Sequence, residues 1–321
     1  MRDFLIDTDT ASDDAVALIM ALRSPEVVVR GITTVAGNVD VTQATRNALY
    51  VRELCGRRDV PVYAGCARPM FRRPVDANWF HGRDGLGDSG FVPGADVACE
   101  AGHGADAIIE LSRKHPGLAL VTLGPLTNVA MAVMREPRVA EWVARCVVMA
   151  GNPLCVGNVT PAAEYNAWCD PEALEVVLRS GLLVELVGWH LSRGDAVCNA
   201  NDVSAARALN TPVANFALDC NRVASEAYFK QTGEVGISLP DPTAMAVALD
   251  PSIVTRASNH PVVVECHSEL TRGQTVVDEL GVSEDPRNID VWKIARESPP
   301  TRVIWTIDVA AFKAMLLRAL A

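Results

Sequence analysis

The chain has 321 residues, 49 % of them hydrophobic and 21 % charged, which is the composition of a globular protein with a sizeable core. Its formal net charge is −10, so the sequence offers no basic footprint for a phosphate backbone, and we expect no nucleic-acid partner. No apolar run is long enough to span a bilayer, so we expect no membrane partner either.

Apolar runs typical of strands alternate with helical stretches along the first two thirds of the chain. The run Phe4–Ile6 is short, as in a buried parallel strand, and Ala15–Leu22 is long enough for a buried helix. Further elements are expected at residues 27–35 (strand), 41–54 (helix), 105–114 (helix), 118–123 (strand), 126–134 (helix), 146–150 (strand), 171–179 (helix) and 183–187 (strand). This alternation predicts an α/β fold with an open, mostly parallel sheet and helices on both faces.

Two irregular stretches, at residues 68–100 and 152–170, interrupt the alternation. Loops of this length within a compact domain are usually lids or binding loops. Beyond them we expect helices within 203–232, a strand-rich appendix at 262–295 and a closing helix at 312–320. Because there is no internal repeat, low-complexity tract or clear linker, the sequence predicts a single domain over residues 1–321.

Four carboxylates follow the first strand within eight residues: Asp7, Asp9, Asp13 and Asp14. Acids packed at a strand-to-helix turn repel one another and lose solvation, which a hard cation such as Ca²⁺ or Mg²⁺ would offset. Helix capping is the alternative, but it accounts for one or two acids at the helix start and not for Asp7 and Asp9 at the strand end. The segment therefore predicts a metal site at the carboxyl edge of the sheet, where function collects in such folds.

A second polar cluster lies in the loop 157–166, where Asn158, Glu164 and Asn166 offer both hydrogen-bond donors and acceptors. Such groups suit a polyhydroxyl ligand, because each sugar hydroxyl both donates and accepts. They could equally be turn residues that satisfy the local backbone. Asp241 precedes an apolar helical run, so it could cap that helix or close the acidic site as a third carboxylate.

The nine cysteines are scattered without Cys-x-x-Cys pairs. This spacing argues against a disulfide framework and a structural zinc site, and it predicts reduced thiols in a cytoplasmic protein. The N-terminal residues lead into a core strand almost at once, so we expect no signal peptide.

Five ordered segments resemble the nucleoside hydrolase family, of the inosine–uridine-preferring type. The family's D-x-D-x-x-x-D-D motif is matched at residues 7–14, and its Ala-Gly-Asn after the second strand at 36–38. A Gly-Pro-Leu-Thr-Asn turn stands at 124–128, the polar loop at 157–166, and a late Asp-Pro at 241–242. The resemblance implies a single-domain, Rossmann-like nucleoside hydrolase fold. It also implies a Ca²⁺-dependent enzyme that hydrolyses ribonucleosides to free base and ribose in nucleoside catabolism.

The resemblance carries over a metal site and its chemistry. Asp9, Asp14 and Asp241 would bind Ca²⁺ through their carboxylates, and Leu123 through its backbone carbonyl. Asp9 would also take a proton from a Ca²⁺-bound water, and Asp7 would support the site from behind.

The resemblance also implies how the substrate is held. The residues expected on the ribose hydroxyls are Asp13, Asn158, Glu164 and Asn166, with Asn38 beside the water and the sugar. The implied partner is a small nucleoside, and the implied assembly is a homodimer or homotetramer.

The chain departs from the family pattern on the side of the nucleobase. Many members place His directly before the late Asp to protonate the leaving base, whereas this chain has Pro240, which has no titratable group. His81 is our candidate acid, although a lone loop His is commonly a surface residue. Trp79 could stack on a purine or merely pack its loop, and Tyr228 resembles a family position that reaches toward the base. A base that leaves readily needs little help, so we expect purine nucleosides to be favoured over uridine.

Three alternatives stay open at this point. A nucleoside-binding homologue with weak or lost catalysis is compatible with Pro240, as is a hydrolase of an unusual modified nucleoside. A phosphatase of the haloacid-dehalogenase type also places D-x-D after its first strand. That class needs a downstream Lys and a further acidic pair, and Lys114 is the only Lys before Lys230.

Overall fold

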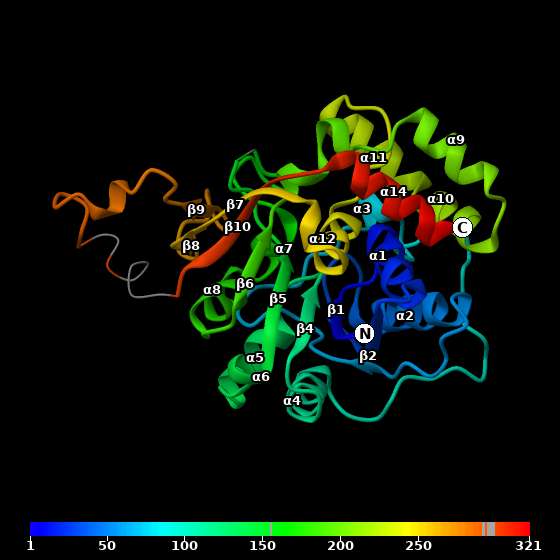
Figure 1. Ribbon diagram of the computed structural model, residues 1–321, viewed down its shortest axis with the longest axis horizontal. Coiled ribbons are helices and arrows are strands. Elements are labelled where there is room, and N and C mark those ends of the chain that lie inside the picture. The colour runs from blue at the N-terminus through cyan, green and yellow to red at the C-terminus, as the bar shows by residue number, and fades with distance from the viewer. Residues whose placement is uncertain (155, 291–292, 294–298) are drawn as a thin grey trace.

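An eight-stranded sheet runs through the computed structural model, which describes residues 1–154, 156–290, 293 and 299–321. The strand order is β3-β2-β1-β4-β5-β6-β10-β7, and all neighbours are parallel except β10 and β7. The strands are β1 (Arg2–Thr8), β2 (Val27–Thr34), β3 (Val62–Ala64), β4 (Leu118–Thr122), β5 (Val143–Met149), β6 (Val184–Val187), β7 (Val254–His260) and β10 (Thr301–Ile307). The predicted α/β class with a mostly parallel sheet is confirmed (Figure 1).

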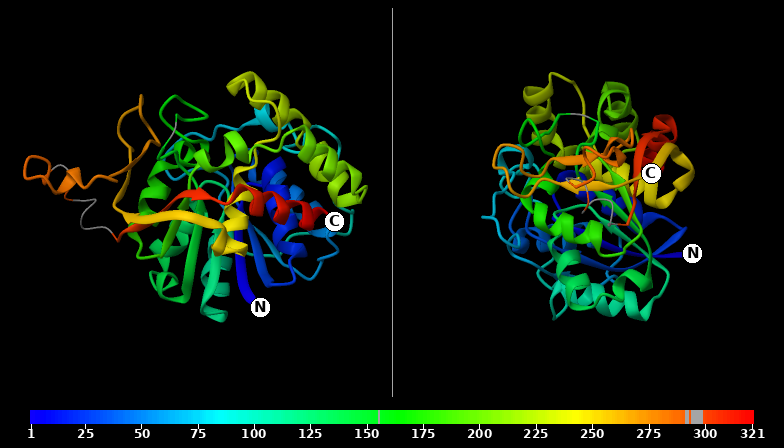
Figure 2. Two further views of the ribbon diagram at one scale, coloured as in Figure 1. Left: turned by 45° about the horizontal axis from the view of Figure 1, so that its top comes forward. Right: turned by 90° about the vertical axis from the view of Figure 1, so that its left-hand side faces the viewer.

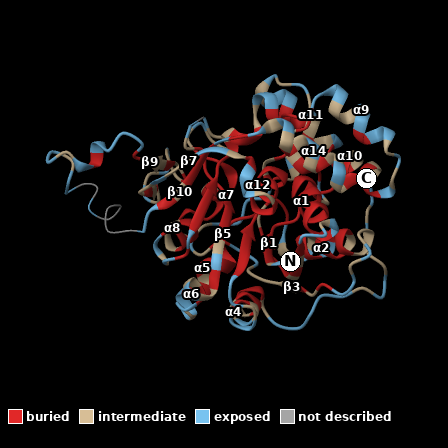
Figure 3. Ribbon diagram, viewed as in Figure 1, coloured by how far each residue is buried: buried red, intermediate tan, exposed pale blue. Residues whose placement is uncertain are grey.

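Helices cover both faces of this sheet. The described α-helices are α1 (Ser12–Arg23), α2 (Val41–Leu54), α3 (Asn78–His81), α4 (Gly104–Lys114), α5 (Thr127–Arg135), α6 (Val139–Trp142), α7 (Tyr165–Cys169), α8 (Pro171–Arg179), α9 (Ala200–Ala208), α10 (Pro212–Cys220), α11 (Arg222–Thr232), α12 (Pro240–Leu249) and α14 (Val309–Leu320). Strand β1 shows why two layers form. Its side chains alternate, so Phe4 and Ile6 join the core under α1, α12 and α14, while Leu5 joins the core under α4, α5 and α8. Figure 3 shows the sheet and the inner sides of α1 and α12 as buried.

The strand-to-helix turn after β1 is built from unusually buried polar residues. Every residue from Asp7 to Asp14 is buried, and α1 follows with no exposed position before Arg23. Helix α12 begins at Pro240, whose missing N–H costs nothing at a first helical position, and Asp241 then faces the α1 side of the molecule. The fold thereby brings Asp241 beside acids more than 200 residues earlier in the chain.

Several elements were not predicted from the sequence. Edge strand β7 carries Arg256, Ser258 and Asn259, so it lacks the apolar pattern of a buried strand, and β10 beside it was also missed. The expected strand-rich appendix at 262–295 contains a hairpin of two three-residue strands, β8 (Val262–Val264) and β9 (Thr275–Val277). Its residues 291–292 and 294–295 lie outside the described part. Figure 2 shows the segment after β9 extending away from the body of the molecule.

Two further expectations concern cysteines and membrane segments. The eight cysteines that the structure describes are free thiols, and Cys155 lies outside the described residues. Among the described helices, none combines the length and the apolar character that crossing a bilayer requires.

Candidate active site

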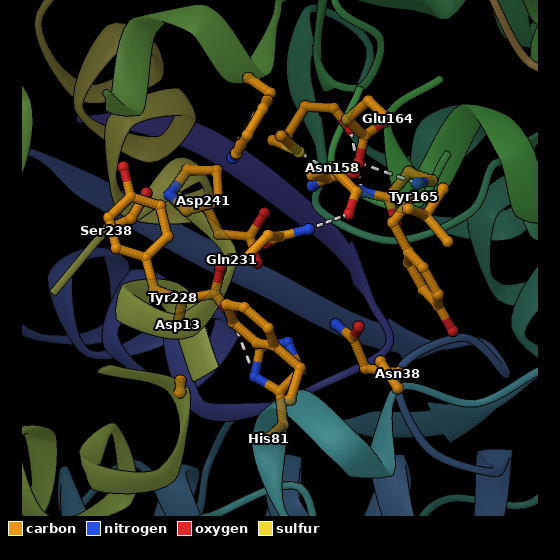
Figure 4. A pocket seen from close by; sticks show the side chains of 18 of the residues that line it. Asp13, Asn38, His81, Asn158, Glu164, Tyr165, Tyr228, Gln231, Ser238 and Asp241 are labelled. Atoms are coloured by element: carbon orange, nitrogen blue, oxygen red, sulfur yellow. Dashed lines mark hydrogen bonds and ion pairs between the residues drawn. The ribbon is translucent and has the colours of Figure 1, made fainter. Parts of the chain in front are cut away.

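The carboxyl ends of the parallel strands meet above α1 and form a pocket. Asp9 follows β1, Asn38 follows β2, Leu123 follows β4, and the loop with Glu164 follows β5. The pocket encloses about 690 Å³ of empty space, part of it open to solvent. Its lining includes Asp13, Asn38, Trp79, Phe80, His81, Leu123, Asn158, Glu164, Asn166, Trp189, Tyr228, Gln231, Ser238, Pro240 and Asp241. Nearly all the residues predicted for a site therefore come together (Figure 4).

Three carboxylates make up an acidic wall beside this pocket: Asp13 and Asp241 line the pocket, and Asp14 lies next to them. One oxygen each of Asp13, Asp14 and Asp241 lies within 4.8 Å of the others, and all three side chains are buried. This grouping differs from the sequence-based expectation, which put Asp9 with Asp14 and Asp241. Asp9 borders the group. Burial, and next to it the charge of Asp14, raises the pKa of Asp9, and the charge of Asp9 adds to the burial that raises the pKa of Asp241.

Short hydrogen bonds fix Asp14 and Asp9, which stand beside the acids that line the pocket. The hydroxyl of Thr8 donates to Oδ1 of Asp14 at 2.5 Å, and the backbone N–H of Ala11 donates to its Oδ2 at 2.9 Å. The backbone N–H of Asn38 donates to Oδ2 of Asp9 at 2.6 Å. Both oxygens of Asp14 thus accept a hydrogen bond, whereas Oδ1 of Asp9 has no hydrogen-bond partner among the described residues.

Two glycines make room for Asp9. A Cβ on Gly37 would overlap Oδ2 of Asp9, and a Cβ on Gly124 would stand 2.7 Å from Oδ1 and 2.9 Å from the backbone nitrogen of Asp9. Both glycines belong to segments that carried the family resemblance. Their role is to leave the space that a buried carboxyl needs at the centre of the sheet edge.

We expect Gly37→Ala to displace Asp9. Overpacking should destabilise the protein by roughly 1–3 kcal/mol and remove most of the activity, because the methyl group and the carboxyl cannot share the space. Urea denaturation measures the loss of stability, and an activity assay measures the loss of turnover. Gly94→Ala is the matched control, since its Cβ would approach only the flexible side chains of Asp96 and Glu53. A fully active Gly37→Ala variant would contradict this role.

The acidic wall suits a hard divalent cation. Oδ1 of Asp9 and Oδ1 of Asp13 are buried and have no hydrogen-bond partner among the described residues. Burial, and next to it the charge of Asp14, raises the pKa of Asp13 to about 8, and the same two causes raise the pKa of Asp9. Carboxylate oxygens are the ligands that Ca²⁺ and Mg²⁺ prefer, so a cation here would relieve both the repulsion and the missing partners.

Asp7 supports the site from behind the pocket. Its Oδ1 accepts hydrogen bonds from the hydroxyl of Thr33 at 2.5 Å and from the amide of Asn128 at 2.7 Å. Asn128 also donates to the carbonyl of Thr34 and accepts from the backbone N–H of Cys66, so it ties the ends of β1, β2 and β3 together. This explains why the Gly-Pro-Leu-Thr-Asn turn belongs to the site without touching the pocket.

Glu164 and Asn166 lie on the opposite wall. The carboxylate of Glu164 is buried and accepts three backbone N–H groups, from Asn166 at 2.8 Å, Gly151 at 2.7 Å and Ala167 at 3.1 Å. The amide of Asn166 donates to the carbonyl of Leu123 at 2.7 Å. The Leu123 carbonyl that was expected to bind the metal thus already accepts one hydrogen bond, and a second lone pair is available.

His81 is buried in the pocket wall and is not the surface residue that a lone loop His commonly is. It belongs to α3, and its Nδ1 lies 2.8 Å from the hydroxyl of Ser12 and 3.8 Å from Oδ1 of Asp13. Burial lowers the pKa of His81 to about 3, so the ring is neutral at pH 7. A neutral ring is a weaker acid than a protonated His, the group that the family pattern places directly before the late Asp.

Trp79 and Tyr228 both line the pocket, on different elements. Trp79, on α3, is 58 % exposed and meets Phe80 edge-on at 5.3 Å between ring centres, so it has room to meet a base. Tyr228, on α11, is buried and donates its hydroxyl proton to Glu234. Pro240 lies in the same lining, where the family often has His.

Sequence reasoning missed Trp189, Gln231 and Ser238, which also line the pocket. Trp189 follows β6, so the rule that function collects at strand ends was a signal that could have found it. Gln231 and Ser238 carried no such signal. The side chain of Gln231 donates to the backbone carbonyl of Asn158, which joins α11 to the loop after β5 (Figure 4).

Comparison with known proteins identifies the family. The model of the inosine–uridine preferring nucleoside hydrolases matches residues 4–314, which is nearly the whole chain. The chain belongs to this family. It is therefore an N-ribosyl hydrolase, and the phosphatase alternative is excluded.

Two curated relatives show how similar other members are. The inosine–uridine preferring nucleoside hydrolase of Leishmania major is 36 % identical over 279 residues, covering 86 % of this chain and 88 % of its own. The pyrimidine-specific ribonucleoside hydrolase RihA of Salmonella typhimurium is 36 % identical over 289 residues, covering 89 % and 92 %. The two relatives are equally identical to this chain, yet their names state different base preferences.

Solved structures agree with the fold. A plant nucleoside hydrolase superposes with a TM-score of 0.90 at 29 % identity, over 99 % of this chain and 98 % of its own. A purine-preferring ribonucleoside hydrolase from Gardnerella vaginalis superposes with a TM-score of 0.86, also at 29 % identity, over 99 % and 98 %. The eight-stranded sheet described above is therefore the fold of nucleoside hydrolases.

Proposed function

We propose that this nucleoside hydrolase is a Ca²⁺-dependent enzyme that cleaves the N-glycosidic bond of ribonucleosides and favours purine nucleosides over uridine. One observation carries the proposal: buried carboxylates from α1 and α12 face a pocket whose opposite wall offers Glu164 and two asparagines. An acidic wall suits a divalent cation, and mixed donors and acceptors suit vicinal hydroxyls.

In this proposal Asp9, Asp14 and Asp241 hold the cation, together with the carbonyl of Leu123. Asp13 is a further candidate, because its oxygen groups with those of Asp14 and Asp241. When bound, a divalent cation supplies Lewis acidity, which lowers the pKa of water at the site. The acids also keep a negative field near the sugar. That field stabilises the positive charge which ribose develops as the base departs.

Asp9 is the proton acceptor of the reaction. Its Oδ1 is buried without a hydrogen-bond partner among the described residues, and Asn38 holds its other oxygen. As the water oxygen bonds to the anomeric carbon, Asp9 takes a water proton, a role worth roughly 10²–10⁴-fold. The bond from that carbon to the base nitrogen breaks, and the nitrogen keeps the electron pair and needs a proton.

The ribose hydroxyls are held by Asp13, Asn158, Glu164 and Asn166. Glu164 presents a carboxylate that three backbone N–H groups hold in place. A deoxyribose would leave such buried groups without a partner, at a cost of roughly 1–3 kcal/mol. Ribonucleosides are therefore the expected substrates.

The preference for purines follows from Pro240 and from the aromatic lining. With no titratable group at residue 240 and a neutral His81, the base must leave with little protonation, which favours purines. Trp79, Phe80 and Trp189 offer ring faces to a bicyclic base.

We expect a higher kcat/KM for inosine than for uridine. Reducing-sugar release from a nucleoside panel, with Ca²⁺ present and after chelation, tests this preference and the metal dependence together. Pro240→His should raise uridine turnover more than inosine turnover, because it adds a titratable group beside the base. A clear uridine preference of the unaltered enzyme would overturn the proposed specificity. Nucleoside binding without turnover would instead point to the inactive-homologue alternative.

A further inference from the structure

The hairpin β8–β9 packs against the wall that carries Glu164. Thr275, the first residue of β9, is buried, and its hydroxyl oxygen accepts the backbone N–H of Asn152 at 2.9 Å, although the two residues are 123 positions apart. The preceding residue, Gly151, donates its own N–H to Oε2 of Glu164 at 2.7 Å. A residue from the C-terminal part of the chain thus fixes the peptide beside one of the donors to Glu164.

The side chain of Thr275 also fits closely against Gly151. Gly151 has a φ of +76°, and a Cβ built on it would stand 2.6 Å from Cγ2 of Thr275 and 2.7 Å from its Oγ1. Glycine is therefore required at residue 151 both for its backbone conformation and for this contact. Both Cγ2 and Oγ1 of Thr275 therefore lie close to the peptide after β5, and the hydroxyl alone binds it.

The same hairpin holds α7, whose N-cap is Glu164. A Cβ on Gly273 would stand 2.6 Å from Cα of Trp168, so the hairpin backbone lies directly against α7. The guanidinium of Arg272 lies 4.0 Å from the ring centre of Trp168. The hairpin therefore contacts both supports of the Glu164 carboxylate, the peptide at Gly151 and the helix that begins after Glu164.

We propose that Thr275 is a positioning residue for Glu164 and, through Glu164, sets the discrimination between ribose and deoxyribose. The inference rests on the proposed function, because it takes Glu164 as a partner of a ribose hydroxyl. Thr275 is not among the residues that line the pocket, and its hydroxyl binds the peptide after β5, on the wall opposite the acids. Its loss should therefore weaken sugar recognition without disturbing the metal site.

Thr275→Val tests the proposal, because it keeps the shape of the side chain and removes the acceptor of the Asn152 N–H. We expect KM for a ribonucleoside to rise about tenfold, as a buried donor loses its partner, while kcat stays within about twofold. The ratio of kcat/KM between a ribonucleoside and its deoxy analogue should fall by a similar factor. Thr275→Ser keeps the hydroxyl and should stay close to the unaltered enzyme. The melting temperature gained on adding Ca²⁺ should be unchanged in both variants.

Glu164→Gln in the same assays shows how much KM and the ribose discrimination change when the Glu164 carboxylate itself is lost. The double variant should lose less than the sum of the two single losses, since Thr275 acts through Glu164. A Thr275→Val enzyme with unchanged KM and unchanged ribose discrimination overturns the inference. A Thr275→Val enzyme that is less stable but equally selective also overturns it, because the role of Thr275 would then be purely structural. If Thr275→Val does not fold, Arg272→Ala tests the same wall through Trp168 and should shift KM and selectivity in the same direction.

The two proposals fail in different ways. If the unaltered enzyme hydrolyses no nucleoside, the proposed function is wrong, whatever the variants do. If it hydrolyses ribonucleosides and Glu164→Gln loses selectivity while Thr275→Val does not, only the role of Thr275 is wrong.

Discussion

Asp9→Ala should lower kcat by roughly 10²–10⁴-fold or more while the fold persists, because the variant has no group to accept the proton of the attacking water. Asp9 is buried between Gly37 and Gly124, so its removal leaves a small space and no new clash. Its charge also raises the pKa of Asp241. The cation-free variant should therefore be at least as stable as the unaltered protein. Reducing-sugar release and thermal unfolding measure the two effects.

Asp195→Ala is the matched control for this variant, since Asp195 is an exposed aspartate that does not line the pocket. It should change neither kcat nor the melting temperature appreciably. Near-normal turnover in Asp9→Ala would refute the assigned role of Asp9. A variant that loses both activity and folding would instead assign Asp9 a structural role, and circular dichroism distinguishes the two outcomes.

Removal of divalent cations should abolish hydrolysis. It should also make the protein less stable as the pH rises. Burial, followed by the charge of Asp14, raises the pKa of Asp13 from 3.8 to about 8. Burial raises the pKa of Glu164 to about 7. At a pH between the pKa of each group in the unfolded state and its pKa in the folded state, the folded state binds more protons than the unfolded state. The stability that each group contributes is therefore fully present below its unfolded-state pKa. It is lost as the pH rises through its folded-state pKa.

The window from pH 6.5 to 8.5 covers the raised pKa values of Asp13 and Glu164. Burial lowers the pKa of His81 to about 3, so above pH 6.5 this ring is mostly neutral in both states and contributes little. In chelator, the melting temperature should fall across the window. Ca²⁺ should restore it, with the larger gain at pH 8.5, because the carboxylates must lose protons to bind a cation. At a cation concentration of 100 times Kd, the free energy of unfolding increases by about 2.7 kcal/mol.

Differential scanning fluorimetry at pH 6.5 and 8.5, with chelator and with Ca²⁺, checks the expectation. A melting temperature that rises toward pH 8.5 in chelator would contradict it, as would indifference to Ca²⁺. Mg²⁺ in place of Ca²⁺ tests the choice of ion, since Mg²⁺ demands a more regular geometry and dehydrates reluctantly.

The sequence was informative where its pattern is local. The short apolar run before Asp7 and the longer one after Asp14 indicated a buried strand and helix, and the alternation of such runs indicated the parallel sheet. It was less informative at the sheet edge, because β7 pairs its polar residues with β10 through the backbone, which leaves no pattern in the side chains. The ordered motifs identified the family before any contact was known, and the match over residues 4–314 bears this out.

Only the tertiary structure decided how closely the predicted polar residues approach one another and in what protonation state they stand. Spacing cannot show that Asp241 joins Asp13 and Asp14 across more than 200 residues, or that His81 is buried and neutral. It also cannot show that Thr275 fixes the peptide beside Gly151. Local sequence sets backbone preference and which faces are apolar. Desolvation, mutual repulsion and hydrogen bonds between distant segments depend on where the folded chain brings those groups, and those terms determine the chemistry of the pocket.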